Sequence, residues 1–357
     1  MNFASDNVWG ASPPVLEAVI RANAGPQAAY GEDEATKRVE ERFCEIFERR
    51  AAVFLVGTGT GANALAVAAA VPPWGLVVCH REAHVIDDEC GAPEFFTHGA
   101  KLAGLPGAGA KLAPGSVAAF LDELPKSVKQ MPPKLLSISQ VTECGLVYAP
   151  QEIAALSQVC RPRGLALHLD GARFANALVR LGCTPAEMTW KQGVDIVTFG
   201  ATKNGGLAAE AIVVFDKTLA ETLAYRRKRS GHLLSKGRLI SAQFEGYFAN
   251  DHWLANARHA NAMAARLAHG LEATGVRLGW PCEANEVFPI LPRGIDDALQ
   301  AAGFVYRGWS ELSLREGERV GAGERIVRLV TSWATEEAAV DRLLATARDA
   351  ARRSAAE

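Results

Sequence analysis

One lysine, Lys203, stands where a ligand can reach it. It follows the apolar run Val194–Phe199 and lies between Thr202 and Asn204, with two glycines immediately after them. A solvated surface lysine needs no such setting. An amine that reacts with a ligand needs close approach and partial desolvation, which lowers its pKa and makes it more nucleophilic. The stretch therefore predicts a reactive amine.

A carboxylate, Asp170, is placed in the same way. It ends the strand-like run 165–170 and begins the tetrapeptide "DGAR", residues 170–173. An acid at this point can bind a positively charged ring nitrogen. It can also simply cap the helix that follows, because Asp is a preferred N-cap residue.

A glycine-rich loop, Gly57–Asn63 ("GTGTGAN"), follows the apolar run 52–56 and precedes a helical pattern. Free N–H groups at a helix start hold phosphate, and Thr58 and Thr60 add hydroxyl donors. A tight turn with no ligand is about as good an interpretation, and Gly57-x-Gly59-x-x-Ala62 also matches the dinucleotide fingerprint.

Alternating strand and helix patterns position these groups. The apolar runs are residues 52–56, 76–79, 135–139, 165–170, 195–200 and 211–216. This alternation predicts an α/β fold with a mostly parallel sheet and helices on both faces. From about residue 250 a long helix, two strand-like runs and a last helix predict a smaller α+β unit. We assign residues 1–245 to the large domain, N-terminal arm included, and residues 246–357 to the small one.

In open α/β sheets, ligands bind outside the carboxyl ends of the strands. The loop, the acid and the lysine each follow such a strand, so all three are expected at one edge. Pyridoxal 5'-phosphate (PLP) needs these three groups: a phosphate site, an acid for the ring nitrogen and an amine for a Schiff base. The sequence therefore predicts a PLP site.

Composition limits the function classes. The chain of 357 residues is 49% hydrophobic and 22% charged, with a net charge of -2, which gives no argument for a nucleic-acid partner or a membrane. Its start lacks the pattern of a signal peptide, and no apolar run is long enough to span a bilayer. The seven cysteines are scattered without a CxxC pair, which favours reduced thiols in the cytoplasm and neither a disulfide framework nor a metal site.

Taken together, these residues resemble the threonine aldolases, which belong to the fold type I PLP enzymes with an aspartate-aminotransferase-like large domain. The matching segments are Thr58-Gly59-Thr60, His84, Asp170–Arg173, Lys203, "SD" (5–6), "YGED" (30–33) and "VRLVTSW" (327–333). The resemblance covers nearly the whole chain. It implies retro-aldol cleavage of L-β-hydroxy-α-amino acids, such as L-threonine and L-allo-threonine, to glycine and an aldehyde.

The resemblance also implies residue roles. Lys203 would hold PLP as a Schiff base, Asp170 would pair with the ring nitrogen, and His84 would stack on the ring and act in catalysis. The other cofactor-binding residues would be Thr58, Gly59, Thr60, Arg173, Arg227 and Lys228. The substrate would contact Ser5, Tyr30, Arg173 and Arg328. Members of the family are homo-oligomers with active sites at a dimer interface, where Tyr30, Arg227 and Lys228 would serve the neighbouring subunit.

One departure concerns the residue that removes the proton from the substrate's β-hydroxyl group. The family commonly has a second histidine after the third strand, whereas this chain reads "ISQVTECG", residues 138–145. His84 is then the remaining candidate, and it would act directly or through water. Glu89 or a phosphate oxygen is the next candidate if His84 does not remove the proton. The altered loop resembles a low-specificity bacterial branch that includes phenylserine aldolases.

Four alternatives stay open. His80 and His84 have the spacing of helical metal ligands, although His80 ends a strand-like run. The loop 57–62, with Arg81 nearby, could serve an NADP-dependent oxidoreductase. An aminotransferase or β-eliminating lyase would use the same cofactor residues. A PLP-binding sensor would need an added interaction domain. His232, His252 and His259 are interpreted as surface or packing residues.

Overall fold

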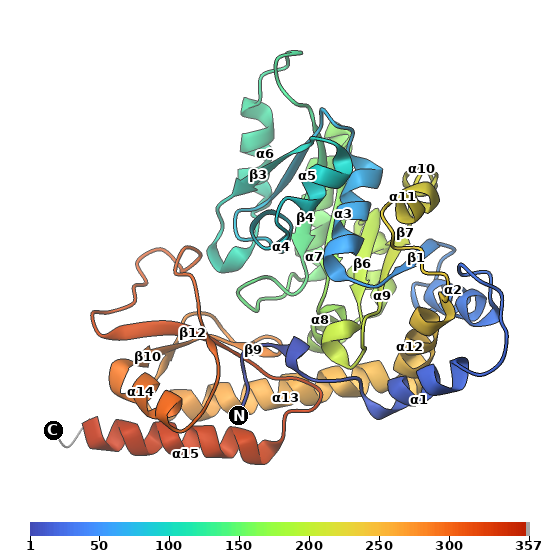
Figure 1. The fold of residues 1–357 in the computed structure, drawn as a ribbon. Helices are drawn as coiled ribbons and strands as arrows, with labels where there is room; N and C mark the ends of the chain where they lie inside the picture. Colours follow the sequence, from blue (N-terminus) through green and yellow to red (C-terminus); the bar gives the residue numbers. More distant parts are fainter. Residues whose placement is uncertain (355–357) are drawn as a thin grey trace.

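The computed structural model describes residues 1–354 and shows a large and a small unit (Figure 1). The large unit is built on a seven-stranded sheet in the order β1-β7-β6-β5-β4-β2-β3. Its strands are β1 (Ala52–Val56), β2 (Leu76–His80), β3 (Lys101–Leu105), β4 (Pro133–Ser139), β5 (Ala166–Gly171), β6 (Ile196–Gly200) and β7 (Glu210–Val214). The predicted mostly parallel α/β sheet is confirmed.

Two features of the sheet differ from the sequence prediction. Strand β7 runs antiparallel to both of its neighbours, β1 and β6, while the other pairs are parallel. Strand β3 was not predicted. It lies at the sheet edge, and most of its residues are exposed or half-buried, so it lacks the continuous apolar run by which the inner strands were found.

Helices cover both faces of the large sheet. Successive residues of a strand point to opposite faces, and on β6 Ile196 packs with α3 (Gly59–Ala70) while Val197 belongs to the core on the other face. That second face is covered by α2 (Glu34–Ile46), α7 (Pro150–Cys160), α8 (Phe174–Leu181) and α12 (Arg238–Phe248). Both faces are therefore closed to water, and the edge formed by the strand ends remains for a ligand.

The remaining helices of the large unit are shorter or peripheral. They are α1 (Pro13–Ala22), α4 (His84–Asp87), α5 (Ala92–Thr97), α6 (Pro114–Glu123), α9 (Pro185–Met188), α10 (Lys217–Ala220) and α11 (Leu223–Arg229). Of these, α4 matters most for the site because it begins at His84. None of the helices within residues 1–354 is long and apolar enough to cross a membrane.

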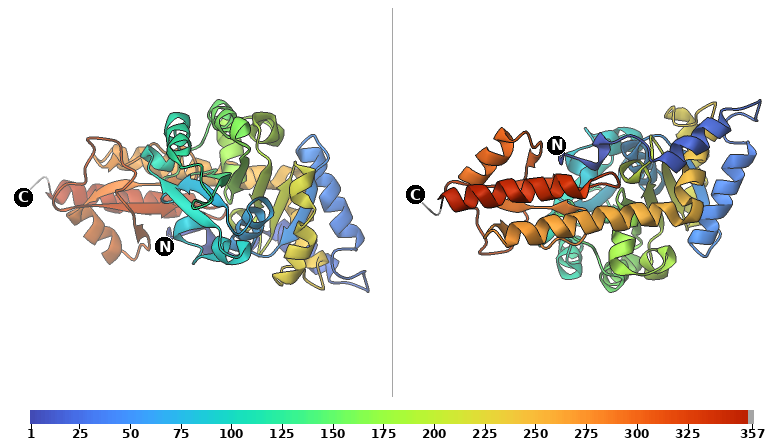
Figure 2. Two further views of the ribbon diagram at one scale, coloured as in Figure 1. Left: turned by 90° about the horizontal axis from the view of Figure 1, so that it is seen from above. Right: turned by 90° about the horizontal axis from the view of Figure 1, so that it is seen from below.

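The small unit is a sheet with helices packed on it. Its strands are β8 (Arg277–Leu278), β9 (Glu286–Val287), β10 (Pro289–Pro292), β11 (Arg307–Gly308) and β12 (Glu324–Val330). Its helices are α13 (His252–Glu272), α14 (Arg293–Ala301) and α15 (Glu337–Ser354). Helices α13 and α15 lie side by side, and α13 extends from the small unit beneath the large one (Figure 2).

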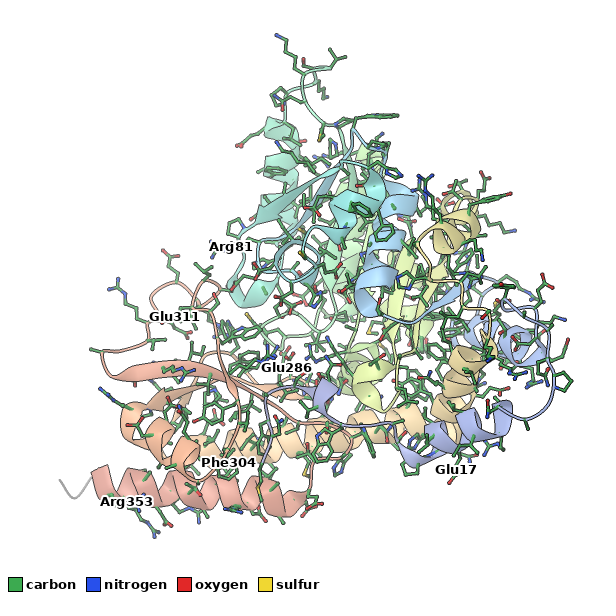
Figure 3. The ribbon with its side chains drawn as sticks, in the orientation of Figure 1. Glu17, Arg81, Glu286, Phe304, Glu311 and Arg353 are labelled. Atoms are coloured by element: carbon green, nitrogen blue, oxygen red, sulfur yellow. The ribbon has the colours of Figure 1, made fainter. Side chains whose placement is uncertain are left out.

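The start of the chain packs on the small unit. Phe3 is buried in its core beside Phe304, the N–H of Phe3 donates to the carbonyl of Val305, and Val330 donates to the carbonyl of Phe3. The arm then passes Glu286, which lies between the units (Figure 3). The division at residue 245 stays a prediction, although these contacts tie the first residues to the small unit.

Candidate active site

The three predicted groups meet in one cleft of about 280 Å³ at the carboxyl ends of β1, β5 and β6. Parallel strands β5 and β6 bring Asp170 and the segment after Gly200 to one edge, and the loop after β1 reaches the same place although β7 separates β1 from β6. The lining includes Thr58, Gly59, Thr60, His84, Asp170, Arg173 and Lys203. It also includes residues that the sequence analysis did not single out: Asn7, Asn63, Glu143 and Glu210.

The loop after β1 is the start of helix α3. The hydroxyl of Thr58 accepts the N–H of Gly61 at 3.0 Å, which caps the helix. The N–H groups of Gly59 and Thr60 belong to the first turn, where a helix supplies no acceptor. These groups and the helix dipole favour an anion. His232 packs against Gly61, where a side chain on residue 61 would collide with it, so this histidine has a packing role beside the anion site.

Asp170 is buried at the end of β5. Its Oδ1 accepts the N–H of Ala172 at 3.0 Å, and its Oδ2 accepts the side-chain amide of Asn63 at 2.8 Å. Helix α8 begins only after Arg173, so Asp170 is not its N-cap residue. The cap alternative is therefore wrong, and the carboxylate is held in place by the strand and by Asn63.

Asn63 connects Asp170 to His84. Its amide also donates to Glu89 Oε1 at 2.8 Å, and the same oxygen lies 2.9 Å from Nδ1 of His84. The hydrogen bond to Glu89 raises the pKa of His84, against the effect of burial. Burial raises the pKa of Glu89. His84 is thus oriented through Nδ1 by a buried carboxylate.

His80 does not join His84. Its Nε2 donates to the carbonyl of Gly107 at 3.1 Å, and its Nδ1 accepts the N–H of Glu82. Within residues 1–354, no three His, Cys, Asp or Glu side chains are grouped so that they could hold a metal ion. Arg81, which an NADP site would need near the loop after β1, donates instead to the carbonyl of Leu312.

Lys203 lies in the short 3-10 turn Thr202–Asn204 just after β6. Asn204 anchors this turn, because its amide donates to the hydroxyl of Tyr247 and the carbonyl of Trp253, both at 2.8 Å. Gly205 has a φ of 107°, and a side chain there would meet Ser12 and Asn256. The small and polar neighbours of Lys203 therefore fix a tight turn that presents a half-buried amine to the cleft.

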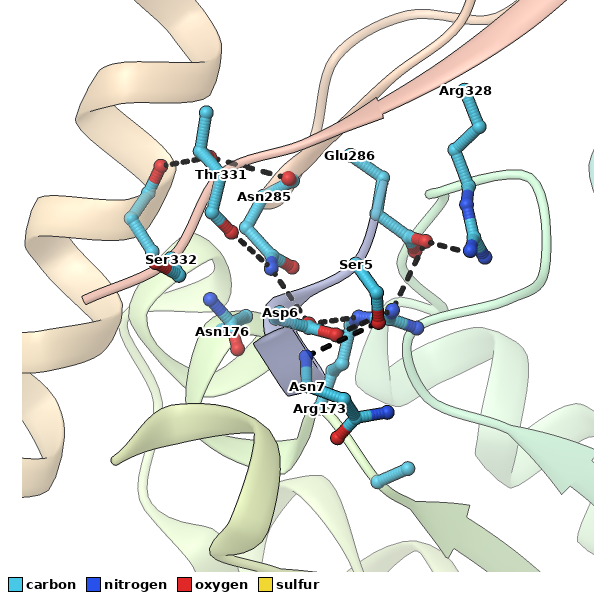
Figure 4. A network of polar contacts seen from close by, with 12 residues as sticks. Ser5, Asp6, Asn7, Arg173, Asn176, Asn285, Glu286, Arg328, Thr331 and Ser332 are labelled. Carbon is cyan, nitrogen blue, oxygen red and sulfur yellow. Dashed lines mark hydrogen bonds and ion pairs between the residues drawn. The ribbon is translucent and has the colours of Figure 1, made fainter. Parts of the chain in front are cut away.

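Arg173 and Arg328 meet in a buried ionic network (Figure 4). Arg173 donates from Nε to Asp6 Oδ2 at 2.8 Å and from Nη2 to Asp6 Oδ1 at 3.2 Å, and its Nη2 lies 3.2 Å from Glu286 Oε1. Arg328 Nη1 lies 3.5 Å from the same Glu286 oxygen. Asp6 and Glu286 raise the pKa of Arg173 despite its burial. Asp6 belongs to the matching segment "SD", but the sequence predicted no role for it, and Glu286 was not predicted at all.

Of the predicted substrate residues, only Arg173 lines the cleft. Ser5 uses its hydroxyl to accept the N–H of Asn7 at 3.1 Å, beside the ionic network. Tyr30 is 48% exposed, and Lys228 Nζ lies 4.5 Å from the centroid of its ring. Arg227 packs over Phe54 at 5.5 Å and donates to the carbonyl of Leu55. Within one described chain, Tyr30, Arg227 and Lys228 do not reach the cleft.

The chain is similar to known proteins over nearly its whole length. Residues 2–291 match the family model described as beta-eliminating lyase. The low specificity L-threonine aldolase of a Pseudomonas species is 42% identical, over 97% of this chain and 96% of that protein, and its counterpart in Pseudomonas aeruginosa is 41% identical over the same shares. The chain belongs to the beta-eliminating lyase family, in its L-threonine aldolase branch. A solved threonine aldolase of Leishmania major superposes with a TM-score of 0.90 at 33% identity, covering 98% of this chain and 99% of that one.

The residues of this family member fit PLP. The cleft offers N–H donors for a phosphate, a carboxylate for the ring nitrogen and an amine for a Schiff base. In addition, Asn63 Oδ1 and Glu210 Oε2 are buried without a hydrogen-bond partner in the part of the chain that the structure describes. Unpartnered polar atoms are costly in a protein interior. Their position in the cleft lining suits a site built for a polar ligand.

We predict that Lys203→Ala folds normally but loses the visible absorbance of the lysine-bound cofactor and all turnover. The reason is that, within residues 1–354, no other lysine lines the cleft. Borohydride reduction of the wild type followed by peptide mass analysis should find the cofactor on Lys203, with Lys228 as the matched control. Cofactor fixed on another lysine would contradict the assignment.

We predict that Asp6→Ala lowers the free energy of unfolding by about 3 kcal/mol, because it breaks a buried ion pair with Arg173. Glu286 still pairs with Arg173, so the loss in the free energy of unfolding should lie at the lower end of the range for broken buried ion pairs. The matched control is Asp341→Ala, which removes an exposed bidentate partner of Arg266 and should change stability little. Equal losses in thermal or urea unfolding would show that burial does not set the cost.

Proposed function

We propose that this L-threonine aldolase family member uses PLP to cleave L-β-hydroxy-α-amino acids to glycine and an aldehyde. The observation that carries this proposal is the meeting of Lys203, Asp170 and the start of α3 in one cleft. Relatives named low specificity L-threonine aldolase, aligned over nearly the whole chain, support the reaction class. L-threonine, L-allo-threonine and phenylserine are the proposed substrates.

Two side chains set the cofactor's chemistry. When bound, PLP supplies an electron sink for the negative charge left on Cα as the Cα–Cβ bond breaks. Asp170, as a carboxylate, keeps a proton on the ring nitrogen. Lys203 would hold the cofactor through Nζ. Thr58, Gly59 and Thr60 bind the phosphate.

The two arginines bind and orient the substrate. Arg173 lines the cleft, and the buried Nε of Arg328 lacks a hydrogen-bond partner within residues 1–354. A carboxylate bound by both would have fixed rotation about the Cα–N bond. Fixing that rotation would hold the Cα–Cβ bond in one orientation for cleavage. Ser5 supports this site from the N-terminal arm.

His84 contributes a flat ring and a positive charge. We propose that it stacks on the cofactor, held by Nδ1 to Glu89 at 2.9 Å. The raised pKa of His84 favours the imidazolium form. The imidazolium form can donate a proton but cannot accept one, which makes His84 a poorer candidate for removing the β-hydroxyl proton.

The working form is proposed to be a homo-oligomer in the cytoplasm, with each site at a dimer interface. Leu207 lines the cleft and is 47% exposed. Apolar surface next to a cleft suits a partner subunit. Tyr30, Arg227 and Lys228 would then complete the partner's site. All seven cysteines are free thiols, which suits a reducing compartment.

We predict that Asp170→Asn keeps the shape of the site and retains PLP, while cleavage falls by about two orders of magnitude or more, because the charge that keeps the ring nitrogen protonated is lost. Absorbance measures cofactor content, and glycine formation from L-threonine measures turnover. A near-wild-type rate would show that Asp170 serves only the fold.

We predict that the wild type cleaves both L-threonine and L-allo-threonine and tolerates phenylserine. The cleft is open, and Val141, Leu207 and Ala208 offer apolar contacts that do not read the configuration at the β-carbon. Glycine and aldehyde should be measured from each substrate at equal concentration. Strict use of one diastereomer would contradict the predicted low selectivity for the configuration at the β-carbon.

A further inference from the structure

Several acids lie in or beside the cleft, and they differ in the hydrogen bonds that they accept. Asp170 accepts hydrogen bonds from Asn63 and Ala172, and Glu89 accepts from Asn63 and His84. Burial raises the pKa of Glu210, at the start of β7, to about 7, and hydrogen bonding from Thr202 and the charge of Lys203 oppose that rise. Glu143 differs: within residues 1–354 its carboxylate forms no hydrogen bond or ion pair, and the half-buried side chain lines the cleft. It is an acid held at the cleft without a protein partner.

The loop that carries Glu143 is rigid. At its base, the amide of Gln140 brackets Tyr148, donating to its carbonyl and accepting its N–H, both at 2.9 Å. The N–H of Gln140 donates to the carbonyl of Asp170 at 2.7 Å. Nearer the tip, Thr142 bonds to Leu146 through both backbone and hydroxyl, and its hydroxyl donates to the carbonyl of Gly109. These bonds fix the backbone on both sides of Glu143 and tie it to the strand that ends in Asp170.

We infer that Glu143 is the catalytic residue that takes the proton from the β-hydroxyl group of the substrate. The inference rests on the proposed function, because it assigns a role within that same cleavage. Glu143 lies in the loop where the sequence lacks the family's second histidine, so a carboxylate supplies the acceptor that the loop otherwise lacks. A group on a fixed loop can hold an acceptor at a set distance from bound substrate.

The step balances without a further reactant. The O–H bond of the β-hydroxyl breaks and its proton moves to a carboxylate oxygen of Glu143. As the Cα–Cβ bond breaks, the C–O bond becomes the C=O bond of the aldehyde. The electron pair of the broken Cα–Cβ bond remains on Cα of the glycine portion. Cα then takes up one proton, and Glu143 loses one. Substrate thus gives one glycine and one aldehyde.

The electrostatic surroundings suit this role. Burial raises the pKa of Glu143 to about 7, while the charges of His84, Lys203 and Arg173 oppose the rise and Glu286 adds to it. A base whose pKa lies near the working pH is effective in both halves of a cycle, because it accepts and then releases a proton. The carboxylate form is needed for cleavage, so kcat/KM should rise with pH through about 7.

The test compares Glu143→Gln, Glu143→Asp and His84→Phe, with the exposed Glu311→Gln as the matched control. Glu143→Gln should retain PLP. Its affinity for glycine, measured from the absorbance change, should stay within about twofold of the wild-type affinity. The variant should also still exchange the Cα proton of glycine with deuterium, a step that needs no β-hydroxyl. Cleavage of L-threonine should fall by about 10²–10⁴-fold, and kcat/KM should no longer rise through pH 7.

Glu143→Asp should recover part of the rate and part of the rise of kcat/KM with pH. Glu311→Gln should match wild type throughout.

His84→Phe distinguishes the two candidate acceptors. If Glu143 accepts the proton, this variant should keep the rise in kcat/KM but shifted to higher pH, because the His84 charge that lowers the Glu143 pKa is gone. Full cleavage by Glu143→Gln, or a pH profile that only His84→Phe abolishes, would overturn the assignment. Loss of glycine exchange in Glu143→Gln would also overturn it, since the residue would then serve the whole site. Wild type that exchanges glycine but cleaves no β-hydroxy-amino acid would instead refute the proposed function.

Discussion

The buried charge of Arg173 is the constraint on which the arrangement of the site depends. A guanidinium that is 7% exposed must be paired, because an unpaired ion in a protein interior is far more costly than a paired one. Its partners come from the N-terminal arm and from β9, more than a hundred residues away in either direction. Satisfying this one side chain therefore fixes the arm and the small unit against the large sheet. The cleft lies at that junction.

The same constraint bears on the proposed binding of a substrate carboxylate by arginines that acids already surround. Asp6 and Glu286 match two guanidinium groups, so the network is formally neutral and can form before any ligand binds. Within residues 1–354 the buried Nε of Arg328 has no hydrogen-bond partner, and we propose that it donates to the substrate. Arg328 also lies 4.3 Å from the centroid of the Trp309 ring, which holds its plane. The guanidinium groups are thus already oriented, which lowers the ordering cost of binding.

Residues near the ends of inner strands were the ones that sequence alone could place. Lys203 and Asp170 follow continuous apolar runs, and parallel strands necessarily bring such ends to one edge. Edge strand β3 and the antiparallel direction of β7 leave no comparable pattern in the sequence. The sequence predicts no role for Asp6, Asn63 and Glu286, because each acts through a contact distant in sequence. It predicts none for Glu143 either, because the sequence of the loop 138–145 does not show which of its side chains lines the cleft. The roles of Tyr30, Arg227 and Lys228 depend on a second subunit, which one chain cannot show.

The acids of the cleft show how one chemical group takes different roles through its surroundings. Asp170 accepts hydrogen bonds from Asn63 and Ala172, which hold the carboxyl group at the end of β5. Glu89 is buried, and its Oε1 accepts from both His84 and Asn63, so it orients these neighbours. Within residues 1–354 Glu143 accepts no hydrogen bond, and burial raises its pKa to about 7. A carboxylate that is well satisfied would be too weak a base to remove a hydroxyl proton. The lack of a protein partner is therefore the property that makes Glu143 suitable, because the missing hydrogen bond is the one that the substrate's hydroxyl can supply.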